Sequence, residues 1–142
     1  MQGTVDVTPR VETNSKGRLW TARIMAGFVV LFLLFDAVIH IAKIAPVVTA
    51  FAQLGYPLST AVGLGILEII CVVLYVAPAT SVLGAILLTG YLGGATATQL
   101  RVGAPIFPLL FPAILGALLW GALVLRDERL RALLPVTSSR SP

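Results

Sequence analysis

The sequence predicts an all-α membrane protein, a polytopic four-helix bundle with its N and C termini in the cytoplasm. Three observations lead to this fold class. Of the 142 residues, 58% are hydrophobic and 11% are charged, against about 45–50% and about 25% in ordinary soluble domains. Four apolar runs come close to the roughly 20 residues that a membrane-spanning helix needs. The basic residues gather at the two ends of the chain, where they set membrane orientation.

The composition also excludes several classes of protein. A soluble globule of this length leaves roughly 30% of its unfolded-chain surface exposed, which is too much for so apolar a chain. The net charge of +4 is confined to the ends, so we expect the lipid bilayer and no nucleic acid as a partner. The single cysteine, Cys71, excludes an internal disulfide and a cysteine-rich metal site.

The two ends of the chain are predicted to be tails. Residues 1–18 are polar and lack a helical apolar stripe, so we expect a flexible cytoplasmic tail there. A cleaved signal peptide is disfavoured, because the first apolar run is longer than about 7–15 residues and carries Asp36. Residues 135–142 are expected to form a disordered tail, which leaves residues 19–134 as one domain.

The domain divides into four predicted spans at about residues 19–44, 59–76, 80–100 and 105–125. Three prolines, Pro105, Pro108 and Pro112, crowd the start of the fourth. We therefore expect residues 105–111 to lie at the membrane face or to form a kinked first segment. The alternating charges of residues 126–131 are expected to continue this helix into solvent.

The connections between the spans predict how the helices neighbour one another. Residues 77–79 and 102–104 are short links, which force antiparallel neighbours. Residues 45–57 form a longer connection with apolar residues at helical spacing, so we expect a short interfacial helix closed by a Gly-Tyr-Pro turn.

The distribution of Lys and Arg predicts the orientation. Arg10, Lys16, Arg18 and Arg23 precede or begin the first span, and Arg126, Arg129, Arg131 and Arg140 follow the last. Only Lys43 and Arg101 lie near the opposite loops. The positive-inside rule then puts both termini in the cytoplasm, with the chain in the plasma (inner) membrane.

A few ionisable residues interrupt the apolar runs. Asp36, His40 and Lys43 are spaced i, i+4 and i+7, which places them on one face of the first helix, and Glu68 lies in the second span. A charged side chain near the bilayer centre costs about 2.5–3.5 kcal/mol on the scale from membrane-insertion experiments, which gives the lowest values. We therefore expect these side chains to face the bundle interior or a water-filled cavity.

The rise per residue places three polar groups at one depth. Asp36 is predicted about 12 Å below the outer surface, and Glu68 and Tyr91 about 14 Å below it. We expect a polar pocket that opens outward, acidic at its floor and basic at its rim. The residues predicted above the floor are His40, Lys43, Thr98, Gln99 and Arg101.

Alternative interpretations of this cluster stay open. The polar residues could be buried pairs that only fix helix register, because such pairs often add little net stability. A metal site is not expected, since the chain has one histidine. No motif identifies catalytic residues. Cys71 is expected to be a small apolar filler, and Gly90-xxx-Gly94 a helix contact.

Several segments resemble one known family. The chain is similar to bacterial DoxX-like membrane proteins over residues 24–135, and the resemblance implies a four-helix membrane bundle. At Gln99 and His40 this chain departs from relatives that carry His and Lys, which puts any chemistry of those positions in doubt here. The segments that carry the resemblance are Asp36–His40, Leu54–Pro57, Leu64–Glu68, Leu88–Arg101 and Leu125–Pro135.

The resemblance and the polar cluster together favour three functional hypotheses. The first is an accessory or quinone-linked subunit of a membrane redox system, working with an oxidoreductase partner and not catalytic alone. The second is a non-enzymatic membrane scaffold or assembly factor. The third is a small solute carrier, which needs a homo-oligomer because four helices are few for alternating access.

Overall fold

The computed structural model describes residues 11–133, which are helical throughout apart from short connections and contain no strand. The predicted all-α class is therefore confirmed. Residues 1–10 of the tail predicted at residues 1–18, and the whole tail predicted at residues 135–142, lie outside the described residues. The helices are α1 (Val11–Ala42), α2 (Ala45–Leu54), α3 (Thr60–Val76), α4 (Ser81–Arg101), α5 (Ile106–Arg126) and α6 (Glu128–Leu133).

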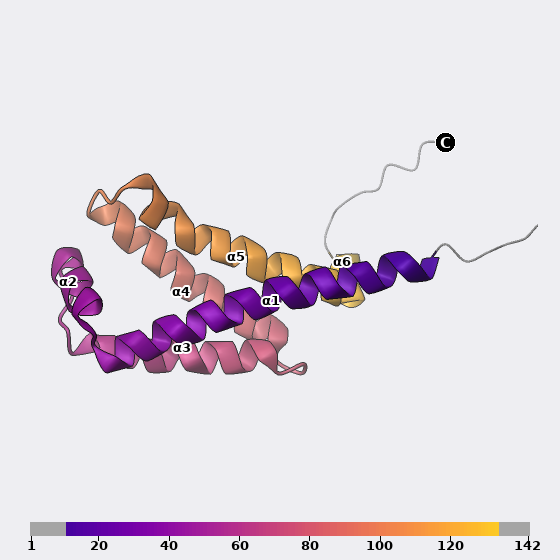
Figure 1. The fold of residues 1–142 in the computed structure, drawn as a ribbon, viewed down its shortest axis with the longest axis horizontal. Helices are drawn as coiled ribbons and strands as arrows, with labels where there is room; N and C mark the ends of the chain where they lie inside the picture. Colours follow the sequence, from indigo (N-terminus) through magenta and orange to yellow (C-terminus); the bar gives the residue numbers. More distant parts are fainter. Residues whose placement is uncertain (1–10, 134–142) are drawn as a thin grey trace, which may run out of the picture.

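The four long helices pack side by side (Figure 1), with α1 and α4 each in contact with both α3 and α5. The core between them is aliphatic apart from the buried Cys71 and Tyr75, whose hydroxyl donates to the Leu119 carbonyl at 3.0 Å. Burying this hydroxyl with a partner avoids the cost of a lost hydrogen bond. The core includes Val29, Leu33, Val72, Tyr75, Leu88, Leu119 and Leu123.

The outer faces of the same helices are strongly apolar. Large side chains such as Leu31 on α1 and Val73 on α3 are more than half exposed, and similar residues cover α4 and α5. An exposed apolar surface this extensive is typical of helices surrounded by lipid. This chain is therefore a membrane protein.

Among the described residues, three helices are long and apolar enough to cross a membrane: Lys16–Ala42 within α1, α4 and α5. Four spans were predicted. The second of them folds as α3, which is apolar but has only 17 residues, at the lower limit for a span. The helix begins directly after its N-cap residue Ser59. It ends before Ala77, whose extended backbone cannot continue a helix.

Two predicted helix boundaries are wrong. Residues 11–18 belong to α1 rather than to a tail, because hydropathy marks where a chain enters lipid and not where backbone hydrogen bonding begins. Of residues 126–131, only Arg126 continues α5, since Asp127 has an extended backbone. The Asp127 carboxylate instead accepts from the N–H of Arg129 at 2.9 Å and so caps the separate helix α6.

Two other predicted elements are found as helices. The connection after α1 contains α2, which ends at Gly55 in the left-handed conformation that glycine adopts without strain. The proline-rich stretch forms the first turns of α5 itself, which runs through Pro112 as one helix. Pro105 and Pro108 lie at the N-cap and in the first turn, where a missing N–H has no partner to lose. Pro112 lies in the second turn, where it leaves out one helical hydrogen bond.

Both ends of the described chain lie at one end of the molecule, and α2 lies at the other (Figure 1). Arg18 on α1 forms an ion pair with Glu128 on α6 at 2.9 Å. From this end the pair α1/α3 and the pair α4/α5 diverge toward α2 (Figure 1). The core therefore fills the end near the termini, and the space near α2 is left for a cavity.

Two glycines allow the helices to approach closely. A Cβ on Gly65 of α3 would lie 2.7 Å from the Ala37 carbonyl oxygen of α1, and one on Gly84 of α4 would lie 2.2 Å from the Tyr75 nitrogen of α3. The predicted contact at Gly90 and Gly94 is wrong, because no atom of the described helices packed against them lies within 4 Å of a Cβ there. The close contacts between helices are instead at Gly65 of α3 and Gly84 of α4.

Candidate functional site: a cavity at the α2 end

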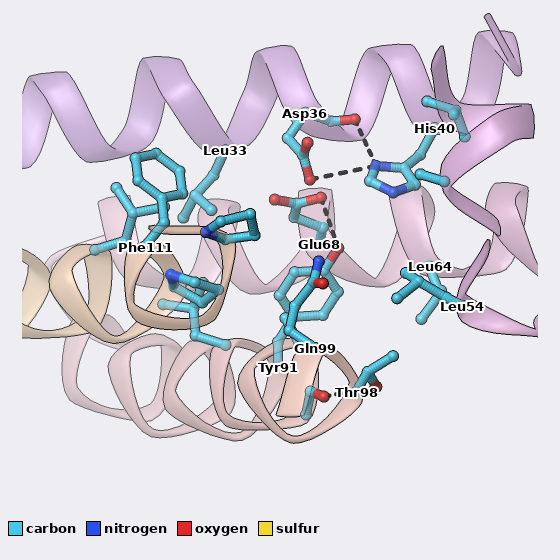
Figure 2. A pocket seen from close by; sticks show the side chains of 18 of the residues that line it. Leu33, Asp36, His40, Leu54, Leu64, Glu68, Tyr91, Thr98, Gln99 and Phe111 are labelled. Atoms are coloured by element: carbon cyan, nitrogen blue, oxygen red, sulfur yellow. Dashed lines mark hydrogen bonds and ion pairs between the residues drawn. The ribbon is translucent and has the colours of Figure 1, made fainter. Parts of the chain in front are cut away.

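A cavity of about 850 Å³ lies between the diverging helix pairs and is covered by α2 (Figure 2). This volume is within the roughly 300–1,000 Å³ of typical small-molecule sites. The five helices α1 to α5 all contribute to its walls, which are mostly apolar. The apolar lining includes Leu33, Val47, Phe51, Leu54, Leu64, Leu87, Phe107, Phe111 and Leu115.

A compact polar group forms one part of the lining. Tyr91 of α4 donates its hydroxyl to Glu68 Oε2 of α3 at 3.0 Å. On α1, His40 Nδ1 lies 2.8 Å from the Asp36 carbonyl oxygen and 3.3 Å from Asp36 Oδ2. Figure 2 shows Glu68 between Tyr91 and Asp36, so three helices meet at this point.

Glu68 is the most deeply buried member of this group. Its side chain has no exposed surface, and its second carboxylate oxygen, Oε1, has no hydrogen-bond partner among the described residues. Asp36, His40 and Glu68 each place a potential ligand atom within 4.8 Å of the other two. This polar group is the acidic cluster, defined by these three residues and Tyr91.

Six of the eight residues predicted for the pocket line the cavity: Asp36, His40, Glu68, Tyr91, Thr98 and Gln99. These six come from α1, α3 and α4, as the helical spacing predicted. Ala95, one turn after Tyr91 on α4, lines it as well.

Lys43 and Arg101 do not line the cavity. Lys43 follows the last residue of α1, with a backbone φ of 50°, so it leaves the face that carries Asp36 and His40. Arg101 donates to the Leu54 carbonyl oxygen of α2 and places its guanidinium 5.7 Å from the centre of the Tyr56 ring. The rim is thus only in part as predicted, since Arg101 holds α2 instead of facing the cavity.

A second polar contact closes the rim between α4 and the turn after α2. The Tyr56 hydroxyl and the Thr98 hydroxyl lie 3.1 Å apart, and Thr98 also donates to the Gly94 carbonyl oxygen. Together with Arg101, this contact fastens the end of α2 to the end of α4. The turn after α2 therefore lies against the end of α4 at the rim of the cavity.

Sequence patterns did not identify several wall residues. The apolar face of α2 was expected at a membrane surface, but Val47 and Phe51 of this face are buried and line the cavity. Gly90 and Gly94 also line it, where their missing side chains leave room. Glycines that contact a helix and glycines that border a cavity have the same spacing, so only the structure separates them.

This arrangement suits a molecule with an apolar body and a polar end. The walls offer aliphatic and aromatic surface, and the acidic cluster offers hydrogen bonds at one place. Such a site buries the body by the hydrophobic effect and orients the polar end by a few directed contacts.

Fold and surface together define an all-helical membrane protein with a partly open cavity between its helices. The chain belongs to the DoxX-like family, whose family model matches residues 24–122. This match spans every residue of the acidic cluster and confirms the resemblance noted from the sequence. No curated protein and no solved structure matches the chain.

Proposed function

We propose that this chain is a membrane-embedded binding subunit that holds a lipophilic molecule with a polar head, of the quinone class, for a membrane oxidoreductase. The cavity of about 850 Å³, apolar along its walls and polar at the acidic cluster, is the observation that carries the proposal.

The proposal places the chain in the membrane as a four-helix bundle. In it, α3 is the fourth span. Ile66, Ile70 and Val73 make its outer face apolar and exposed, which suits lipid and not water. A 17-residue helix is about 26 Å long, close to the roughly 30 Å of a hydrocarbon core. Both termini then lie on the basic, cytoplasmic side of the inner membrane.

A quinone fits the chemistry of the cavity better than a hydrophilic solute does. Its polyprenyl chain can lie against apolar walls such as Leu33, Phe51 and Phe111. Its ring oxygens accept hydrogen bonds, which the Gln99 amide, with two donor hydrogens, can donate. A fully water-soluble molecule would leave most of the wall without a favourable partner.

An oxidoreductase partner follows from the composition of the chain. One histidine and one cysteine in the whole sequence cannot provide a bis-histidine haem site or a redox-active cysteine pair. If a quinone is reduced or oxidised here, another subunit has to deliver or remove the electrons. The role of this chain is then to bind and position the quinone.

The test compares two substitutions three residues apart on α4. Gly90 lines the cavity and Gly93 does not, and a Cβ at either position meets no atom of the described helices packed against it. We expect Gly90→Phe to fill part of the cavity and Gly93→Phe to add a ring on the outer face of α4. Wild-type protein and both variants are extracted from native membranes in mild detergent, and bound lipids and proteins are measured by mass spectrometry.

The proposal predicts quinone in near-stoichiometric amount with wild type and Gly93→Phe, and at least tenfold less with Gly90→Phe. An oxidoreductase subunit should accompany the wild-type chain. Bulk phospholipid alone in all three samples contradicts the proposal and favours a membrane scaffold or assembly factor. A bound polar solute together with a crosslinked homodimer favours the carrier.

A further inference from the structure

We propose that Asp36, His40 and Glu68 form a binding site for a first-row divalent metal ion of the Zn²⁺ class at the polar end of the cavity. This site is independent of what occupies the apolar remainder of the cavity, because its ligands all come from this chain.

The donor set is the first argument. One imidazole and two carboxylates place a ligand atom each within 4.8 Å of the others, and His40 Nδ1 lies 3.3 Å from the Asp36 carboxylate. Tetrahedral zinc with bonds of about 2.1 Å needs its ligand atoms roughly 3.4 Å apart. Small side-chain rotations are enough to bring the three residues to this spacing.

The unpartnered oxygen of Glu68 is the second, independent argument. Glu68 Oε2 accepts from Tyr91 at 3.0 Å, while Oε1 has no hydrogen-bond partner among the described residues, although the side chain is completely buried. A buried polar atom without a partner costs about 1–3 kcal/mol. A metal ion bound by Oε1 would remove this cost, and the hydrogen bond from Tyr91 would keep the carboxylate oriented.

The charge around the cluster is the third argument. No lysine or arginine is among the described residues that line the cavity, since Lys43 is exposed and Arg101 contacts Leu54. Two carboxylates in a membrane interior need a compensating positive charge or a proton, and a protonated His40 beside Asp36 could balance only one of them. A divalent cation supplies that charge at the one place where both carboxylates reach it.

His40 Nδ1 is the ring nitrogen that faces the Asp36 carboxylate, so the metal ion would bind there. In the structure this nitrogen donates to the Asp36 carbonyl oxygen at 2.8 Å. Binding through Nδ1 would replace that hydrogen bond and leave the ring proton on Nε2, since a neutral imidazole has one protonated nitrogen.

The types of ligand narrow the choice of metal. Imidazole favours zinc, iron, nickel or copper over magnesium and calcium, and three protein ligands leave an open position. The open position would face the cavity, so a bound molecule could supply the fourth ligand. From the sequence, the lack of a second histidine argued against a metal. The structure adds that both carboxylates, from two helices, lie close to the one histidine.

The test measures binding of zinc alone to the full-length protein. The chain carries a tag without histidines, is stripped with a chelator in detergent, and is titrated with Zn²⁺ by calorimetry, with bound metal checked by elemental analysis. We expect one Zn²⁺ per chain. The variants Glu68→Gln and Asp36→Asn each remove one ligand and should weaken binding at least tenfold, whereas the matched control Glu128→Gln, outside the cavity, should not.

Two results overturn the proposal. The first is no Zn²⁺ binding by the wild-type chain, which would mean that the two carboxyl groups share a proton. The second is equal binding by wild type, Glu68→Gln and Asp36→Asn, which would mean adventitious binding at the protein surface. If Glu68→Gln does not fold, Asp36→Asn and His40→Gln decide the question. As a second measurement, Zn²⁺ should raise the melting temperature of the wild type and of Glu128→Gln but not of the ligand variants.

Discussion

At the residue scale, the hydrogen bond from Tyr91 to Glu68 joins α4 to α3 inside the acidic cluster. Without it, both carboxylate oxygens of a completely buried side chain would lack a partner among the described residues. The contact thus contributes to stability and also keeps Glu68 oriented. These two consequences can be measured separately from ligand binding.

Tyr91→Phe removes this hydroxyl and leaves the ring in place. We expect the variant to be less stable by about 1–3 kcal/mol, because a buried acceptor loses its partner. Tyr56→Phe is the matched control, since Tyr56 is partly exposed and its contact with Thr98 can be replaced by water. Thermal unfolding in detergent, followed by circular dichroism, compares them. Equal melting temperatures for the two variants would contradict this role of Tyr91.

The sequence predicted the acidic cluster better than the rest of the site. Asp36, His40, Glu68 and Tyr91 follow from helical periodicity and from counting the depth of each residue, which are both local properties. Lys43 was misplaced because α1 ends at Ala42, one residue before Lys43, whereas the predicted helix continued to residue 44. A helix end depends on the packing that follows it, and no local pattern marked it here.

At the element scale, the contact between α1 and α3 depends on Gly65. A Cβ there would lie 2.7 Å from the Ala37 carbonyl oxygen, 2.8 Å from the Ile41 side chain and 3.3 Å from His40 Cβ. The first of these atoms belongs to the backbone and cannot rotate away. The packing of α1 on α3 therefore also determines where His40 lies relative to Glu68.

Gly65→Ala should push α1 and α3 apart and destabilise the protein by about 1–3 kcal/mol. The control is Gly63→Ala on the same helix, where a Cβ meets no neighbouring atom and helix propensity favours alanine by up to about 1 kcal/mol. Melting temperatures of the two variants should shift in opposite directions. A shift of the same sign and size in both would show that the close contact at Gly65 is not required.

Helix content was predictable at this scale, but helix boundaries and contacts were less so. Apolar periodicity and length predicted the long helices and α2. The extension of α1 to Val11 and the break at Asp127 depend on backbone hydrogen bonds in polar segments, which hydropathy does not report. Which glycines touch a neighbouring helix depends on helix rotation, and that is set by the whole packing arrangement.

At the scale of the whole molecule, the ion pair of Arg18 with Glu128 holds the start of α1 beside α6. The two ends of the described chain therefore lie at one end of the molecule, and α2 lies at the other (Figure 1). With the four spans proposed above, both ends would lie on one side of the membrane. The basic residues near both ends predict that the shared side is the cytoplasm.

Single cysteines in a Cys71→Ser background test this orientation. Lys16→Cys and Arg129→Cys lie at the terminal end, and Thr49→Cys lies on the exposed face of α2. A membrane-impermeant maleimide added to intact spheroplasts should label Thr49→Cys alone, and all three after permeabilisation. Labelling of Lys16→Cys in intact spheroplasts would reverse the orientation, and labelling of only one terminal position would contradict the even number of spans.

The central claim is that the cavity beneath α2 binds a quinone. The most direct measurement is photo-crosslinking with a quinone that carries a diazirine on its tail, in membranes that contain the full-length chain, followed by peptide mapping. We expect crosslinks to residues of α2 and α5 that line the cavity, such as Phe51 and Phe111, and their loss in Gly90→Phe but not in Gly93→Phe. Crosslinks confined to lipid-facing residues such as Phe28 or Ile70 would contradict the account.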